Sequence, residues 1–250
     1  MALNFILLFF TALLAGLLVF VTPVLKEKYF KLVLVFAGSY LFSITILHIL
    51  PELFSGSYNP SRMGVYILIG FLLQQLLEYW SAGIEHGHIH KHESSTYKGV
   101  FTLMIGLFIH AFLEGTLLSH GDSSTQQGLA LAQEHSDKTV LLGILMHKGP
   151  AAFALAAVLG ASLSKKWTLI LLTIFALGSP LGMLSSAFFI NQGLLSTEGI
   201  GILYGLVTGG FLHISTTIFF ESSPHHKFQL NKLAITFLAA ALAFASEYLI

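Results

Sequence analysis

Cysteine is absent from this sequence of 250 residues, and charge is scarce, since Asp, Glu, Lys and Arg make up only 10% of it. The lack of cysteine excludes disulfide bonds and thiolate ligands, so any metal site must use nitrogen and oxygen donors. A soluble domain carries roughly 25% charged residues, whereas here 55% are hydrophobic and the mean hydropathy is +0.80. The sequence therefore predicts an all-α integral membrane protein in a lipid bilayer. Twelve basic residues balance twelve acidic ones, so no nucleic-acid partner is expected.

Eight apolar stretches of about 20 residues, the length of a membrane-spanning helix, follow one another along the chain. The predicted spans are 4–24, 30–52, 63–85, 99–119, 139–163, 167–191, 199–221 and 230–249. A signal peptide carries positive charge before its apolar stretch, and this sequence carries none there. We therefore expect the first stretch to stay in the protein as a membrane span. We therefore expect a single transmembrane domain over residues 1–250.

Lysine and arginine are distributed unevenly between the two sides of this membrane domain. Nine lie in the connections on one side, two on the other side and one within a span. Because cytoplasmic loops carry the excess of these residues, we expect both termini outside and the connection at 86–98 in the cytoplasm. Alternating histidines in that connection suit a flexible segment that wraps a metal ion. They are His86, His88, His90 and His92.

The middle of the fourth and fifth spans carries ionisable groups, which are costly in a membrane and usually functional. His110 and Glu114 are four residues apart and share one face of a helix. At 1.5 Å per residue, Glu114 and His147 both lie roughly 6 Å to the outer side of the centre. Two imidazoles and one carboxylate form a suitable first shell for a divalent cation such as Zn²⁺.

Lys148 follows His147 directly and opposes cation binding at first sight. It could pair with Glu114 or another carboxylate, take the place of a second metal ion, or form a structural ion pair between spans. Three spans also contain a proline, at Pro51, Pro150 and Pro180. Each proline frees a helix carbonyl, which is common where ions pass, although a packing kink explains Pro180 equally well.

Two further polar groups lie nearer the ends of spans. His48 and Glu52 share a face near the outer end of the second span; they form either an outer binding station or an ordinary solvated pair. His213, Thr217 and Glu221 follow at four-residue steps towards the inner end of the seventh span. That stripe suits an exit path for the ion, and the hydroxyl groups beside it suit helix–helix contacts equally.

These patterns resemble the ZIP (Zrt/Irt-like) family of divalent metal transporters. The matching motifs are His-x-x-x-Glu-Gly at 110–115, His-x-x-Pro at 147–150, His-Ile-Leu-Pro-Glu at 48–52 and Ser-Pro-Leu-Gly at 179–182. The resemblance implies a 3+2+3 helix bundle, in which spans 1–3 and 6–8 are inverted repeats around spans 4 and 5. It implies alternating access that moves Zn²⁺ into the cytoplasm, with Fe²⁺, Mn²⁺, Cd²⁺ or Co²⁺ as alternatives. The implied ligands are His110, Glu114 and His147, with His48 and Glu52 further out.

The sequence differs from the fullest family pattern at Ala111, Lys148 and Ala151, where many members have further ligands. The resemblance therefore implies the branch in which a lysine replaces the second metal, which leaves one transported ion. No ATP-binding GxxxxGK[ST] motif is present.

We thus predict a transporter rather than an enzyme, in a plasma membrane or a bacterial inner membrane. The alternatives are an intramembrane zinc-dependent hydrolase, although no HExxH motif is present, and a metal sensor. Deletion of 86–92 would inactivate a sensor and only slow or deregulate a transporter. The metal, the driving force and the oligomeric state, a homodimer included, stay open.

Overall fold

The structure is a computed structural model that describes residues 1–21, 27–55, 59–81, 97–119, 127–221 and 230–248. These ranges are almost entirely helical and contain no strand. The α-helices are α1 (Ala2–Leu17), α2 (Glu27–Ile44), α3 (Leu50–Ser55), α4 (Pro60–Ser81), α5 (Tyr97–Thr116), α6 (Gln127–Ser162), α7 (Lys165–Asn191), α8 (Thr197–Glu221) and α9 (Leu230–Tyr248). Short turns of other helix types are η1 (Leu18–Phe20), η2 (Thr45–Ile49) and η4 (Leu117–Ser119).

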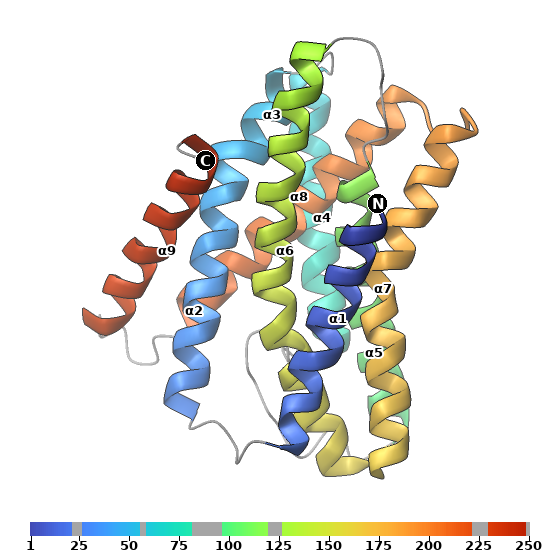
Figure 1. Cartoon of the computed structure of the whole chain (residues 1–250), viewed down its shortest axis with the longest axis vertical. Helices are drawn as coiled ribbons and strands as arrows, with labels where there is room; N and C mark the ends of the chain where they lie inside the picture. The colour runs from blue at the N-terminus through green and yellow to red at the C-terminus, as the bar shows by residue number, and fades with distance from the viewer. Residues whose placement is uncertain (22–26, 56–58, 82–96, 120–126, 222–229, 249–250) are drawn as a thin grey trace.

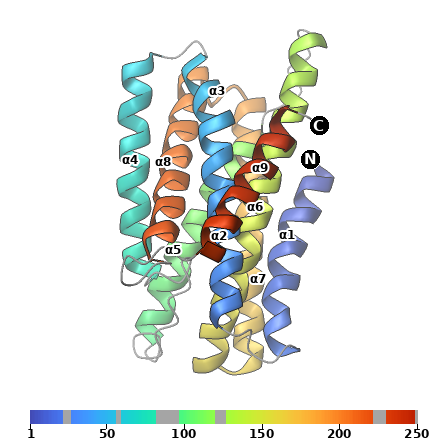
Figure 2. The same ribbon diagram turned by 90° about the vertical axis from the view of Figure 1, so that its left-hand side faces the viewer.

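Within these ranges, eight helical segments are long and apolar enough to cross a membrane. Their positions agree with the eight predicted spans, so the prediction of an all-α, multi-pass integral membrane protein is confirmed. The two termini lie at the same end of the bundle (Figures 1 and 2). Which end faces outward, and the 3+2+3 repeat, stay predictions. The histidines at 86, 88, 90 and 92 lie outside the described residues.

Helix α6 begins earlier than its predicted span. The span was expected from residue 139, and the apolar segment does begin at Lys138, but the helix begins at Gln127. The hydropathy pattern marks the part of a helix that lipid can surround, whereas helical hydrogen bonds also form in water. The connection between the fourth and fifth predicted spans is therefore partly helical.

The second span contains one wide turn just before its proline. The N–H of Leu50 donates to the carbonyl oxygen of Thr45, five residues earlier, which makes η2 a π-helical turn. Such turns occur often at functional sites in α-helices, and His48 lies within this one. By contrast, α6 and α7 continue through Pro150 and Pro180.

Helices α4 and α8 lie side by side and cross at glycines (Figure 2). A methyl group on Gly70 would lie 2.0 Å from the carbonyl oxygen of Leu206, and one on Gly209 would lie 2.0 Å from that of Ile67. Both distances are far below van der Waals contact. Only glycine therefore allows the two backbones to approach this closely, as is common in membrane bundles.

Helices α5 and α7 form a second pair of the same kind. A methyl group on Gly115 would lie 1.9 Å from the carbonyl oxygen of Ser179, and one on Gly182 would lie 1.9 Å from that of Phe112. Because Gly115 follows Glu114 directly, this crossing fixes the backbone beside the candidate ligand.

Candidate metal site

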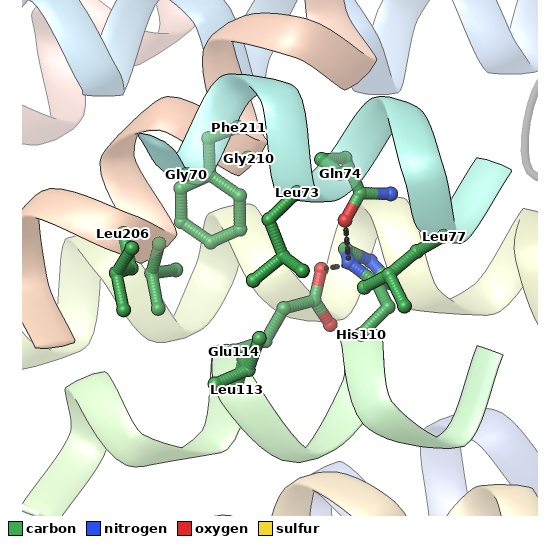
Figure 3. A pocket seen from close by; sticks show the side chains of 11 residues that line it. Gly70, Leu73, Gln74, Leu77, His110, Leu113, Glu114, Leu206, Gly210 and Phe211 are labelled. Atoms are coloured by element: carbon green, nitrogen blue, oxygen red, sulfur yellow. Dashed lines mark hydrogen bonds and ion pairs between the residues drawn. The ribbon is translucent and has the colours of Figure 1, made fainter. Parts of the chain in front are cut away.

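His110 and Glu114 contact each other one turn apart on α5, as their spacing predicts (Figure 3). His110 Nε2 lies 2.8 Å from Glu114 Oε1. The two residues are only 5% and 2% exposed. A charged carboxylate so deep in the molecule requires a positive partner, because burial without one is strongly unfavourable.

His147 brings a third donor to the same place from α6. Its Nε2 lies 3.6 Å from Glu114 Oε1, and its ring centre lies 5.7 Å from that of His110 at an interplanar angle of 86°. One donor atom from each of the three residues lies within 4.8 Å of the others. Ligands of a tetrahedral Zn²⁺ lie about 3.3 Å apart, so the three donor atoms would move closer together to share one ion and would fill three of its four positions. The structure thus brings together the three side chains chosen from the sequence.

Gln74 on α4 holds the other nitrogen of His110. Its Oε1 accepts a hydrogen bond from His110 Nδ1 at 2.9 Å (Figure 3). Both side chains line a small pocket between α4, α5 and α8. Sequence reasoning missed Gln74, although an amide side chain within an apolar span was a visible signal.

Lys148 is 1% exposed and links three helices. Its ammonium group donates to the Ser179 hydroxyl on α7, which donates in turn to the carbonyl oxygen of Ala111 on α5 at 2.7 Å. It also lies 4.8 Å from the centre of the Phe175 ring. Among the described residues no carboxylate lies within ion-pair distance of it, so its positive charge acts on Glu114 only through space.

His48 belongs to a separate cluster. Its Nε2 lies 3.2 Å from Glu52 Oε2, as the spacing predicts, and its Nδ1 lies 2.8 Å from Glu247 Oε1 on α9. The Glu52 side chain is 37% exposed. The imidazole therefore connects two carboxylates from different helices. Sequence reasoning missed Glu247, which lies almost 200 residues further along the chain.

His213 on α8 is buried beside α4. Its Nδ1 lies 3.3 Å from Glu78 Oε2, and its ring packs against Phe71. Thr217 donates back to the His213 carbonyl oxygen of its own helix. Glu78 was missed, although it lies four residues after Gln74 in the predicted span. Glu221 ends α8, and its side chain lies outside what the structure describes.

Comparison with known proteins gives a consistent set of relatives. No protein-family model matches the sequence. The chain is 26% identical to zinc transporter ZIP9 of Xenopus tropicalis over 162 residues, 62% of this chain and 50% of that protein. It is 27% identical to ZIP9 of Micropogonias undulatus over 165 residues (62% and 49%) and 30% identical to zinc transporter ZIP1 of Danio rerio over 149 residues (56% and 42%). The chain thus spans about half the length of the curated relatives it matches.

Proposed function

We propose that this chain, which belongs to the ZIP (Zrt/Irt-like) family, is a transporter that moves a divalent metal ion across the membrane and is not an enzyme. Zn²⁺ is the first candidate, because the named relatives are zinc transporters and the available donors are imidazole and carboxylate. The observation that carries the proposal is the convergence of His110, Glu114 and His147 in the interior of the bundle.

The three donors suit an ion that is bound only in transit. Glu114 supplies the negative charge that a cation needs after it has lost its water, and the two imidazoles replace part of the hydration shell. Three protein ligands leave room for a water molecule or a backbone carbonyl. A transport site must bind strongly enough to admit the ion and weakly enough to release it; an incomplete shell meets both needs.

The route of the ion is part of the proposal. His48 and Glu52, 3.2 Å apart, would receive it on the outer side. His213 and Glu78, 3.3 Å apart, would receive it on the inner side. Beyond them, Glu221 and the histidines of 86–92 would pass it into the cytoplasm. Alternating access around the central cluster would keep the two sides from opening at once.

We also propose that Lys148 takes the place of a second metal ion. Its ammonium group is buried next to His147 and has a hydroxyl and an aromatic ring as neighbours instead of a carboxylate. A fixed positive charge there would leave Glu114 free for one transported ion. The protein would then carry a single ion per cycle.

Zinc uptake into proteoliposomes that contain the purified protein tests the function. We expect saturable influx by the wild type and loss of influx in His110→Ala and Glu114→Ala. Glu198→Ala is the matched control, because Glu198 is exposed and pairs with Arg62 at a helix end; its uptake should equal the wild type. Stoichiometric zinc binding without influx by the wild type would overturn the transporter and favour a sensor or a hydrolase.

A further inference from the structure

We propose that Gln74 is a positioning residue for the transported ion, and that it acts by fixing the orientation of the His110 ring. The inference rests on the proposed function, because it concerns the affinity of the same central cluster. Gln74 lies on α4, outside the sequence motifs, and is not one of the three proposed ligands.

The hydrogen bond to Gln74 decides which nitrogen of His110 is left for the ion. The side-chain carbonyl oxygen of Gln74 has no hydrogen to donate, so His110 Nδ1 must carry the hydrogen of the 2.9 Å bond. Nε2 is then the nitrogen that points at Glu114, 2.8 Å away. Metal-binding histidines commonly donate their other N–H to an oxygen in this way, which fixes the ring.

The surroundings of Gln74 hold its amide in place. Gln74 is 3% exposed, and Leu73 and Leu77 flank it in the pocket wall (Figure 3). One turn earlier, Gly70 anchors α4 against the α8 backbone. Because the pocket wall around it is largely apolar, the hydrogen bond to His110 is stronger and more directional than it would be in water.

The acceptor is a neutral amide where a carboxylate of almost the same shape would fit. A carboxylate in this position would make the imidazole a stronger ligand and would add negative charge near the ion. Tighter binding favours loading and slows release. The amide at Gln74 therefore orients His110 while it keeps the affinity in a range that allows turnover.

Two substitutions at Gln74 are expected to act in opposite directions. Gln74→Leu removes the acceptor, and loss of such a partner lowers metal affinity by about 10–100-fold, so the Kd for Zn²⁺ and the KM for uptake should rise by that factor. Gln74→Glu should lower both and also lower the maximal rate. Gln75→Leu is the matched control: Gln75 is the next residue, but it is exposed, so its binding and uptake should equal the wild type.

A double-mutant cycle tests whether Gln74 acts through His110. In a His110→Ala background, with Zn²⁺ titrated into the millimolar range, Gln74→Leu should cause no further loss of affinity. A loss of the same size in both backgrounds would overturn the inference, and so would wild-type Kd and KM in Gln74→Leu. If the wild type neither binds nor transports Zn²⁺, the proposed function itself fails. If only the Gln74 effects are absent, the function stands and the positioning role falls.

Discussion

The motif His-x-x-x-Glu occurs twice in this protein, and its two copies have different surroundings. In the central cluster, His110 turns one nitrogen to Glu114 and the other to the neutral amide of Gln74. In the outer cluster, both nitrogens of His48 face carboxylates, those of Glu52 and Glu247. The same spacing therefore contributes to a group of three converging donors in one place and to a link between helices in the other.

The two clusters also differ in how deeply they are buried and in the third residue that joins each pair. The side chains of His110 and Glu114 are 7% and 2% exposed, and His147 arrives from another helix to share the same oxygen. In the outer cluster the Glu52 side chain is 37% exposed, so water competes for its charge. Four-residue spacing places two side chains on one face, but the neighbouring helices decide what that pair can bind.

The strongest test of this comparison replaces the glutamate of each motif by its neutral isostere. Glu114→Gln removes a charge whose partners are buried, which costs about 3–5 kcal/mol and should lower zinc uptake by about 100-fold or more. Glu52→Gln removes an exposed charge worth about 1 kcal/mol or less, so uptake should fall less than about fivefold. Initial rates in proteoliposomes measure both. Equal losses in the two variants would show that the clusters are equivalent.

A second test uses the glycine that follows the glutamate of the central motif, Gly115, a position that Leu53 takes in the outer motif; an exposed glycine, Gly160, is its control. Gly115→Ala forces a methyl group against the Ser179 carbonyl oxygen and should destabilise the protein by about 1–3 kcal/mol, with lower uptake. Gly160→Ala, where nothing lies within 4 Å, should stabilise its helix by about 0.5–1 kcal/mol. Thermal unfolding in detergent measures both. A Gly115→Ala variant as stable as the wild type would contradict the close crossing.

The smallest effect is expected at Glu247. Glu247→Gln keeps an oxygen acceptor for His48 and loses only the charge. The free energy of unfolding should therefore change by about 1 kcal/mol or less. Zinc uptake should change by about twofold or less. Thermal unfolding and the KM for zinc check this. Complete loss of transport in Glu247→Gln would show that zinc uptake depends on the outer cluster as strongly as on the central one.

The sequence was sufficient for the spans and for pairs within one helix. Apolar stretches located all eight segments, because their length follows from the thickness of a bilayer. Residue counting placed His147 and Glu114 at a common depth, and the structure brings their donor atoms together. The fifth span was predicted to within one residue of its observed bounds, Lys138–Ser162, but its helix begins earlier, at Gln127, because hydropathy reports contact with lipid and not where a helix begins.

The partners from other helices could not be predicted. Gln74, Glu78 and Glu247 reach their histidines across helix interfaces, and the rotation of each helix about its axis depends on packing that spacing alone does not determine. One signal was present: Gln74 and Glu78 are two polar residues four apart in an apolar span. Read like the other such pairs, they would have pointed to a polar face on α4.

The close crossings of α4 with α8 and of α5 with α7 bear on how the central cluster would release an ion. At Gly70 and Gly115 the backbones touch so closely that α4 with α8, and α5 with α7, are each expected to move as one piece. The hydrogen bond that His110 donates to Gln74 joins these two pairs of helices. A displacement of one pair against the other would stretch that bond and free the His110 ring to rotate. Separation of the two helix pairs and a lower affinity for the ion would then occur in the same step.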